Sequence, residues 1–341
     1  MTGPDAMTET TSDPRERRQP CRRIVTPPPF VTDAYRAARS AARETGTVNP
    51  APPSLPVARG PNSGYLSKHL DSVDKETTMR YYLLGTLMAM SAVAHAEVQT
   101  REIPYTAADG TEMIGYYAYD DAIEGKRPGV VVVHEWWGLN DYAKSRARDL
   151  AELGYSALAI DMYGEGKHTE HPKDAMSFMK AALSDAEAAK GRFNAGLDLL
   201  KQQAQTDTEK LAAVGYCFGG KVVLDMARQG APLDGVVSFH GALATQTRAT
   251  PGSVKARVLV EHGAADSMVS ADDVAALSAE MVKAGADYQL VSLPGAKHGF
   301  TNPGADKFQK QGVDVAYNQT ADERSWQDMQ RFLDETFESG Q

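Results

Sequence analysis

The amino-acid sequence predicts an α/β protein with a mostly parallel, doubly wound sheet and helices on both faces. Two observations support this fold class. From about residue 129 onward, short apolar segments alternate with longer helical segments. Several of these short segments, such as 257–261, have the pattern of a buried strand. A chain that alternates in this way forms right-handed crossovers, which cover both faces of a parallel sheet.

The individual elements can be placed in order along the chain. Segments 99–105 and 112–119 are expected to form an antiparallel hairpin at one edge of the sheet. Further strands are expected at 129–134, 155–160, 211–216, 235–239, 257–261 and 288–293. Helices are expected at 141–153, within 172–205, and at 221–228, 271–284 and 321–337. Long loops at 163–171 and 300–316 should lie on the side of the sheet where the strands end.

The segment 214–220 reads Val-Gly-Tyr-Cys-Phe-Gly-Gly and joins an expected strand to an expected helix. This is the arrangement of a nucleophile elbow, with Cys217 where serine is usual. Gly215 and Gly219 flank it at the two positions where a tight turn leaves no room for a side chain. The thiol would stand at a helix N-terminus, where backbone N–H groups favour a thiolate. A buried structural cysteine on a glycine-rich turn is the alternative interpretation.

An acid and a histidine follow the cysteine, each just after an expected strand. Asp266 comes after the strand at 257–261, and His298 comes after the strand at 288–293. Both should project from the same edge of the sheet as Cys217. The order of nucleophile, acid and histidine is that of α/β-hydrolases. A thiolate, a base and an orienting carboxylate together predict cleavage of an ester or lactone through a thioester acyl-enzyme.

This reaction also needs two N–H donors for the oxyanion. The backbone N–H of Phe218, the residue after the nucleophile, is the expected first donor. The second is expected from the turn after the strand at 129–134, at the N–H of Trp136.

With these features the sequence resembles the dienelactone hydrolase family, the cysteine-nucleophile branch of the α/β-hydrolases. The resemblance covers about residues 103–337 and is carried by HEWWG at 134–138, GYCFGG at 215–220, GAAD at 263–266 and HGF at 298–300. It implies an α/β-hydrolase fold, with Cys217 as nucleophile, His298 as base and Asp266 as the residue that orients the histidine. It also implies that Glu135 pairs with Cys217 at rest, which would protect the sulfur from oxidation. Capping of the following turn is the alternative role for Glu135.

Four more residues lie just past expected strands and are expected to line the substrate pocket: Trp137, Tyr163, His240 and Phe300. They would favour an apolar or aromatic acyl group, although core packing explains each of them equally well. No metal site is predicted, because His168 and His171 have no further ligands at a suitable spacing. The predicted chemistry needs no cofactor.

One departure from the family bears on the substrate. The resemblance implies arginines that grip a substrate carboxylate, one of them just after the His-x-Phe motif. Here the run from 298 reads HGFTNP, and segment 167–182 contains no arginine. Lysine cannot supply a bidentate fork. A neutral ester or a different lactone is therefore as compatible with the sequence as a dienelactone.

The first part of the chain differs in composition from the rest. Residues 1–78 contain 11 of the 18 prolines and no sustained periodicity, which predicts disorder. Residues 79–96 combine an arginine, a 14-residue apolar run and Ala-His-Ala, which is typical of a secretory signal peptide. We expect translation to begin at Met79 and the mature domain to span 97–341, in the periplasm or secreted. An authentic disordered extension and a buried apolar helix are the alternatives.

Charge and cysteine content narrow the functional class. Removal of residues 1–96 takes away 12 of 36 basic and 9 of 45 acidic residues and leaves a net charge of −12. Such a domain does not suit nucleic acid or an anionic membrane. Its single cysteine, Cys217, has no partner for an internal disulfide and is either reactive or deeply buried.

The sequence therefore predicts an exported hydrolase of small-molecule esters or lactones, either a monomer or a small homo-oligomer. A non-catalytic thiol sensor or ligand-binding protein is the main alternative, because a fold alone does not establish activity. A glutamine-amidotransferase-like or DJ-1-like protein would also carry cysteine on an elbow, but Asp266 and His298 stand at hydrolase positions. A broad esterase without a dedicated substrate remains a third alternative.

Overall fold

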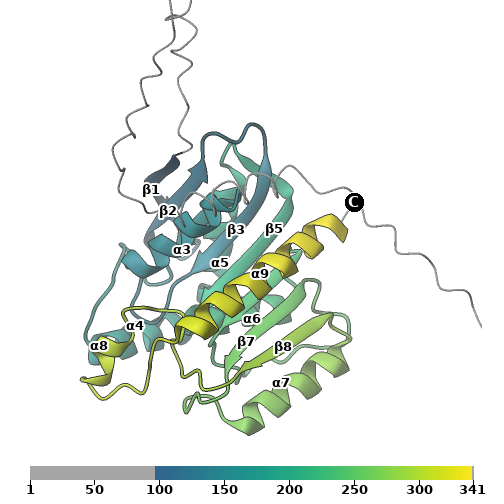
Figure 1. Cartoon of the computed structure of the whole chain (residues 1–341). Coiled ribbons are helices and arrows are strands. Elements are labelled where there is room, and N and C mark those ends of the chain that lie inside the picture. The colour runs from purple at the N-terminus through teal and green to yellow at the C-terminus, as the bar shows by residue number, and fades with distance from the viewer. Residues whose placement is uncertain (1–96, 340–341) are drawn as a thin grey trace, which may run out of the picture. The chain divides into compact units, whose positions relative to one another are not determined.

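The computed structural model describes residues 97–339. An eight-stranded sheet runs through this part of the chain in the order β1-β2-β4-β3-β5-β6-β7-β8 (Figure 1). The leader expected at 1–78 and the signal peptide expected at 79–96 lie outside the described residues. Among the described residues, no helix has the length and apolar character needed to cross a bilayer.

The sheet confirms the predicted α/β class with one antiparallel edge. β1 (Val98–Thr106) pairs antiparallel with β2 (Glu112–Asp120), and β2 pairs antiparallel with β4. All other neighbours in the sheet are parallel. These strands are β3 (Arg127–Val133), β4 (Ser156–Ile160), β5 (Thr206–Tyr216), β6 (Gly235–Phe239), β7 (Arg257–Gly263) and β8 (Tyr288–Leu293).

Helices cover both faces of the sheet (Figure 1). The helices α3 (Asp141–Glu152) and α9 (Gln319–Ser339) pack on one face. On the other face lie α5 (Ala186–Lys201), α6 (Phe218–Arg228) and α7 (Ala271–Ala284). The expected helical segment 172–205 contains α4 (Pro172–Leu183), which packs against α5. The structure adds the short α8 (Asp306–Gln309) within the expected loop 300–316.

Side chains at the helix ends explain where several helices begin and stop. Asn140 accepts the N–H of Ala143 at 3.2 Å at the start of α3. Ser270 and Asp273 form a reciprocal capping box at the start of α7, which satisfies two N–H groups that lack helical partners. Gly285 ends α7 in the left-handed conformation, which glycine adopts without steric cost.

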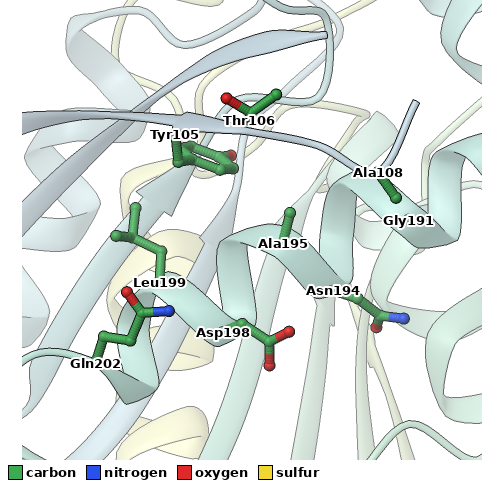
Figure 2. A pocket seen from close by; sticks show the side chains of 9 residues that line it. All are labelled: Tyr105, Thr106, Ala108, Gly191, Asn194, Ala195, Asp198, Leu199 and Gln202. Atoms are coloured by element: carbon green, nitrogen blue, oxygen red, sulfur yellow. The ribbon is translucent and has the colours of Figure 1, made fainter. Parts of the chain in front are cut away.

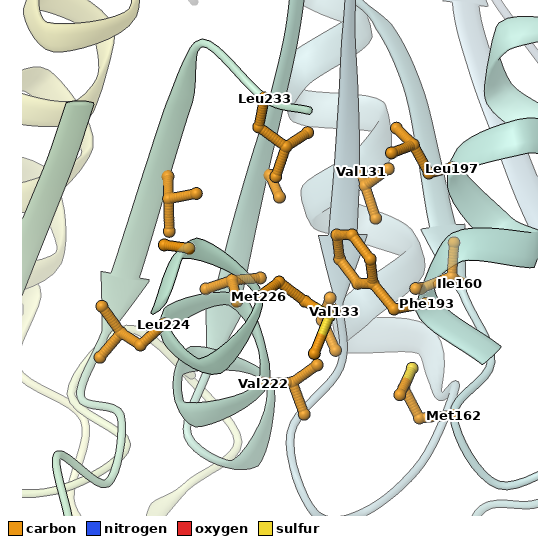
Figure 3. Close-up of a cluster of buried hydrophobic side chains, with 14 of the residues drawn as sticks. Val131, Val133, Ile160, Met162, Phe193, Leu197, Val222, Leu224, Met226 and Leu233 are labelled. Atoms are coloured by element: carbon orange, nitrogen blue, oxygen red, sulfur yellow. The ribbon is translucent and has the colours of Figure 1, made fainter. Parts of the chain in front are cut away.

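The parallel strands are apolar on both sides because both sides are buried. Val131 and Val133 of β3 face the cluster built with α5 and α6, whereas Val130 and Val132 face the cluster built with α3 and α9. Figure 3 shows the first cluster, in which Phe193 of α5 lies close to the β3 valines. Burial on both faces is why these strands appear as unbroken apolar runs in the sequence.

The strand order reverses at β3 and so creates a crevice. β4 lies on one side of β3, and β5, the next strand along the chain, lies on the other side. In open α/β sheets the crevice at such a reversal, beyond the carboxyl ends of the strands, is where ligands bind. The segments that follow β3 and β5 carry Glu135 and Cys217.

Glu261 of β7 is an ionisable group within the apolar interior. It is completely buried, and neither carboxyl oxygen has a hydrogen-bond partner within residues 97–339. Burial, together with the charge of Asp328, raises the pKa of Glu261 to about 8, although Arg331 and Arg324 oppose the shift. The folded protein therefore keeps this carboxyl protonated at neutral pH.

We predict that Glu261→Gln makes the protein less sensitive to alkaline pH. Between about pH 5 and pH 8 the unfolded chain ionises this carboxyl and the folded protein does not, so stability falls as pH rises. Across this range, the melting temperature of the variant should rise relative to that of the parent as pH increases. Thermal denaturation at several pH values measures it, with the exposed Glu209→Gln as control. A difference that does not change with pH would contradict the prediction.

Candidate active site

Cys217 stands on a sharp turn between β5 and α6. Its φ is 54° and its ψ is −112°, a region that residues other than glycine rarely adopt. A Cβ atom on Gly215 would lie 2.1 Å from the carbonyl oxygen of Gly219, and one on Gly219 would lie 2.2 Å from that of Val133. Both positions therefore require glycine, because the start of α6 lies directly against β5 at Gly215 and against the end of β3 at Gly219.

Hydrogen bonds to the backbone hold the strained turn in place. The N–H of Cys217 is shared between the carbonyl oxygen of Phe239 at 3.0 Å and Nδ1 of His240 at 3.1 Å. The N–H of Gly219 donates to the carbonyl oxygen of His134 at 3.1 Å. Strain of this kind persists only where the surroundings determine it fully, and the two adjacent segments at the ends of β6 and β3 do so here.

The loops after β7 and β8 bring Asp266 and His298 together. Nδ1 of His298 lies 2.8 Å from Oδ2 of Asp266, and Oδ1 of Asp266 accepts the N–H of Met268 at 2.8 Å. The two loops touch at Gly263, where a Cβ would meet the carbonyl oxygen of Ala296 at 2.5 Å. The carboxylate therefore fixes both the orientation of the imidazole and its protonated nitrogen.

The second ring nitrogen of His298 faces the nucleophile. Nε2 is buried and makes no regular hydrogen bond within the described residues. Burial lowers the pKa of His298, but the Cys217 sulfur and the Asp266 carboxylate more than compensate, and the pKa is raised well above its usual value. This is the electrostatic pattern of an imidazole beside a thiol that it can deprotonate.

Two backbone N–H groups are available near the sulfur. Those of Trp136 and Phe218 have no acceptor within residues 97–339. Phe218 is the first residue of α6, and Trp136 lies in the turn after β3. Their role as oxyanion donors stays a prediction.

Glu135 has a different partner from the one that the family resemblance implies. It is 3% exposed, and its Oε2 accepts a hydrogen bond from Nδ2 of Asn302 at 2.6 Å. No hydrogen bond between Glu135 and Cys217 occurs in the described part of the chain. An amide N–H is a stronger donor to a carboxylate than a thiol S–H, which accounts for the choice of partner.

Tyr163 is the expected pocket residue that lies beside the nucleophile. Its hydroxyl donates to the carbonyl oxygen of Trp136 at 3.0 Å, and its ring contacts that of Phe178 with centroids 5.7 Å apart. Burial raises the pKa of Tyr163, and the charge of Cys217 raises it further. The partly exposed Trp136 and Phe178 complete an aromatic wall here.

The structure places the other three expected pocket residues in the interior. Trp137 stacks on Phe308 with centroids 3.7 Å apart, and Phe300 is completely buried. His240 is also completely buried, and both of its ring nitrogens are engaged, with Cys217 N–H and with Oγ1 of Thr301 at 2.7 Å. Apolar packing and hydrogen bonding, rather than access to a substrate, explain these positions.

A chain of polar groups continues from His240 to the last helix. Oγ1 of Thr301 lies 2.6 Å from the hydroxyl of Tyr142. Arg146 donates to the carbonyl oxygen of Thr301 at 2.6 Å and to Asp322 of α9 at 2.6 Å. The backbone that carries Cys217 is therefore tied through His240 to α3 and α9.

Sequence reasoning did not identify Asn302 or Asp161 as site residues. Asp161 accepts the N–H groups of Tyr163, Gly164 and Gly166 at 2.8–2.9 Å, which shapes the loop that carries Tyr163. The position of Asp161 between an apolar strand and a glycine-rich loop could have indicated this role. No such indication existed for Asn302, because its role depends on how the loop after His298 folds.

A separate surface hollow of about 450 Å³ lies between the end of β1 and α5 (Figure 2). Tyr105, Asn194, Asp198 and Gln202 are among the residues that line it. Cys217, Asp266 and His298 do not line it, so this hollow is distinct from the candidate active site. In the described part of the chain no three His, Cys, Asp or Glu side chains gather as metal ligands would.

Comparisons with known proteins agree with this fold. The model of the dienelactone hydrolase family matches residues 113–337. Protein usf of Aquifex pyrophilus is 31% identical over 51% of this chain and 77% of its own length. A putative carboxymethylenebutenolidase of Aquifex aeolicus is 28% identical over 57% of this chain and 84% of its own length. The crystal structure of a dienelactone hydrolase-like promiscuous phosphotriesterase from metagenomic libraries is 38% identical, with a TM-score of 0.65, over 70% of this chain and 98% of that one.

We predict that Gly219→Ala destabilises the protein by about 3 kcal/mol or more and changes the reactivity of the Cys217 thiol. The added methyl group collides with the backbone of Val133, which no side-chain movement can relieve. Thermal denaturation and thiol alkylation measure the two effects. The control is Gly191→Ala in α5, where the nearest atom lies 3.8 Å away and a gain of about 0.5–1 kcal/mol is expected. An unchanged melting temperature for Gly219→Ala would contradict the close packing described above.

Proposed function

The chain belongs to the dienelactone hydrolase family and is a hydrolase of esters or lactones, and we propose that it acts through Cys217, His298 and Asp266 by way of a thioester acyl-enzyme. The observation that carries this proposal is the arrangement of the three groups. The cysteine stands on a turn that only glycine neighbours permit, and the Asp266–His298 pair faces it. This geometry suits acyl transfer by a nucleophile with an adjacent base.

The first half of the reaction forms the thioester. His298 holds the thiol proton, and the Cys217 sulfur attacks the carbonyl carbon of the ester or lactone. The carbonyl electrons move onto oxygen, and the N–H groups of Trp136 and Phe218 stabilise the resulting oxyanion. When the oxyanion collapses, the C–O bond to the alkoxide breaks and His298 gives its proton to the leaving oxygen.

The second half releases the acid. A water molecule gives a proton to His298 and attacks the thioester carbonyl, and the same two N–H groups stabilise the second oxyanion. Collapse of this intermediate expels the Cys217 sulfur, which takes up the proton from His298. Asp266 remains ionised throughout and keeps Nδ1 of His298 protonated, so that Nε2 is always the nitrogen that exchanges the proton.

The surroundings of the sulfur favour a neutral substrate. The aromatic wall of Trp136, Tyr163 and Phe178 offers apolar contact. Arg146, on the neighbouring α3, is largely buried and is committed to Thr301 and Asp322. We therefore propose a neutral ester or lactone with an apolar or aromatic acyl group, rather than a substrate held by its carboxylate.

A second substrate class has support from one comparison. The structure that is 38% identical over 98% of its own chain is described as a promiscuous phosphotriesterase. A thiolate with two N–H donors suits a tetrahedral phosphoryl centre as it suits an acyl oxyanion. An aryl phosphotriester therefore belongs in the panel of substrates.

We also propose that the enzyme acts outside the cytoplasm, on the strength of the signal-peptide pattern at 79–96. The natively expressed protein should then begin at Glu97. N-terminal sequencing measures this, and any peptide from residues 1–78 in that protein would contradict the expected start at Met79.

We predict that Cys217→Ala lowers kcat/KM by about a thousandfold or more on p-nitrophenyl acetate, p-nitrophenyl butyrate and dihydrocoumarin. Asp266→Asn should cost about a hundredfold to ten-thousandfold, because it disturbs the tautomer of His298. Steady-state hydrolysis measures both, and mass spectrometry of the quenched enzyme should show the acyl group on Cys217.

The control is Asn194→Ala in the hollow of Figure 2, which should leave the rates unchanged. Equal turnover by the parent and Cys217→Ala would reject the thioester mechanism, and no turnover by either protein would favour a binding or thiol-sensor role. A loss in Asn194→Ala would instead place the chemistry near the hollow.

A further inference from the structure

The hydrogen-bond partners of Asn302 determine which way its side-chain amide is oriented. Its Oδ1 accepts the N–H of Gly304 at 2.8 Å. Its Nδ2 donates to Oε2 of Glu135 at 2.6 Å. Rotation of the amide would place two acceptors together at Glu135 and two donors together at Gly304. Glu135 therefore always meets the NH₂ end of Asn302.

Asn302 is also rigidly connected to the catalytic histidine. It lies in the same loop as His298, and its N–H donates to the carbonyl oxygen of Gly299 at 3.0 Å. Its own carbonyl oxygen accepts the N–H of Ala305 at 2.9 Å. Asn302 is 6% exposed and Glu135 is 3% exposed. The loop that places the imidazole therefore also places a donor for the glutamate.

Several groups act on the charge of Glu135. Burial raises the pKa of this carboxyl to about 7, although the hydrogen bond from Asn302 and the charges of His298 and Arg146 favour its ionised form. On α3, Tyr142 is the other titratable group that senses this carboxyl, and its own pKa is raised by burial and in part by Glu135. A substantial fraction of Glu135 is therefore ionised at neutral pH.

The Glu135 carboxylate would make Cys217 less reactive if it approached the sulfur. A negative charge beside a thiol disfavours the thiolate, and the thiolate is the reactive form. In the structure the carboxylate binds Asn302 instead, and the Cys217 sulfur acts on His298. If Glu135 is released from Asn302 and turns to the sulfur, its charge would lower the thiolate content of the resting protein.

We propose that Asn302 is a positioning residue that holds the Glu135 carboxylate away from the Cys217 sulfur and leaves the thiol to His298. This inference rests on the proposed role of Cys217 and His298, and it adds the residue that sets their resting state. It differs from the arrangement that the sequence implies, in which Glu135 itself pairs with the thiol at rest.

The test is the pH dependence of Cys217 alkylation by iodoacetamide, followed by mass spectrometry on the peptide that contains Cys217. Asn302→Ser retains an acceptor that can reach the N–H of Gly304 but is too short to reach Glu135. In this variant Glu135 is released toward the sulfur, and alkylation at pH 7 should slow by about tenfold, which corresponds to a rise of about one in the thiol pKa. At pH 9 and above the rates should converge.

The double variant Asn302→Ser with Glu135→Gln separates positioning from general damage. A neutral glutamine at position 135 cannot oppose the thiolate, so the alkylation rate of the double variant at pH 7 should return to within about twofold of that of Glu135→Gln alone. A rate as low as that of Asn302→Ser alone would overturn the proposal, because the defect would then not act through the charge at position 135. An unchanged rate in Asn302→Ser would overturn it as well.

Asn318→Ser is the matched control. Asn318 lies in the same part of the chain and caps α9 by accepting the N–H of Ala321 at 3.1 Å, without contacting Glu135. Its alkylation profile should follow that of the parent. A shift as large as that of Asn302→Ser would assign the effect to loop stability and contradict the proposal.

A second pair keeps the test decisive if Asn302→Ser does not fold. Asn302→Asp combined with Glu135→Gln reverses the donor and the acceptor of the buried hydrogen bond while preserving its length. Its alkylation profile should match that of Glu135→Gln, and a tenfold slower rate would overturn the proposal. Alkylation requires no turnover, so it tests the role of Asn302 independently of the hydrolysis assay. A failure of this proposal can therefore be distinguished from a failure of the proposed thioester mechanism.

Discussion

The close contact between the start of α6 and the end of β3 is the constraint on which the site depends. Gly219 lies against the carbonyl oxygens of Val133 and His134, so the elbow cannot move without moving β3. This contact sets Cys217 beside the turn that carries Glu135 and Trp136. It also explains why the two glycines and the positive φ of Cys217 occur together: the backbone accepts local strain where the turn after β5 meets the turn after β3.

Around that contact, most of the buried ionisable side chains form a hydrogen bond or an ion pair. Asp266 has His298 and the N–H of Met268, Glu135 has Asn302, and Arg146 has Asp322. Burying an unpaired charge is costly, so each pairing also fixes a position. Glu261 is the contrasting case, since its carboxyl remains neutral in an apolar setting. The cost of burying an unpaired charge thus explains both observations: paired groups are held in place, and the unpaired Glu261 is neutral.

Much of this arrangement could be predicted because it is encoded locally. Each catalytic candidate follows a strand, and parallel strands end at one edge, so Cys217, Asp266 and His298 were expected to converge. Other features depend on contacts between distant segments. β5 begins at Thr206 instead of the expected 211 because it pairs with Arg127 and Pro128. His240 and Phe300 have the residue types of a pocket wall, but only the folded loops show that they are buried. The partner of Glu135 likewise depends on the shape of the loop after His298.

The polar chain that runs from His240 to Asp322 has a consequence for how the protein is made. The hydrogen bonds that support the Cys217 backbone pass from His240 through Thr301 and Arg146 to α9, the last described helix. A polypeptide still leaving the ribosome has β5, the elbow and the histidine loop before it has this helix. The thiol therefore gains its full support only when synthesis is complete, and a chain shortened before α9 retains the cysteine without the framework that holds it.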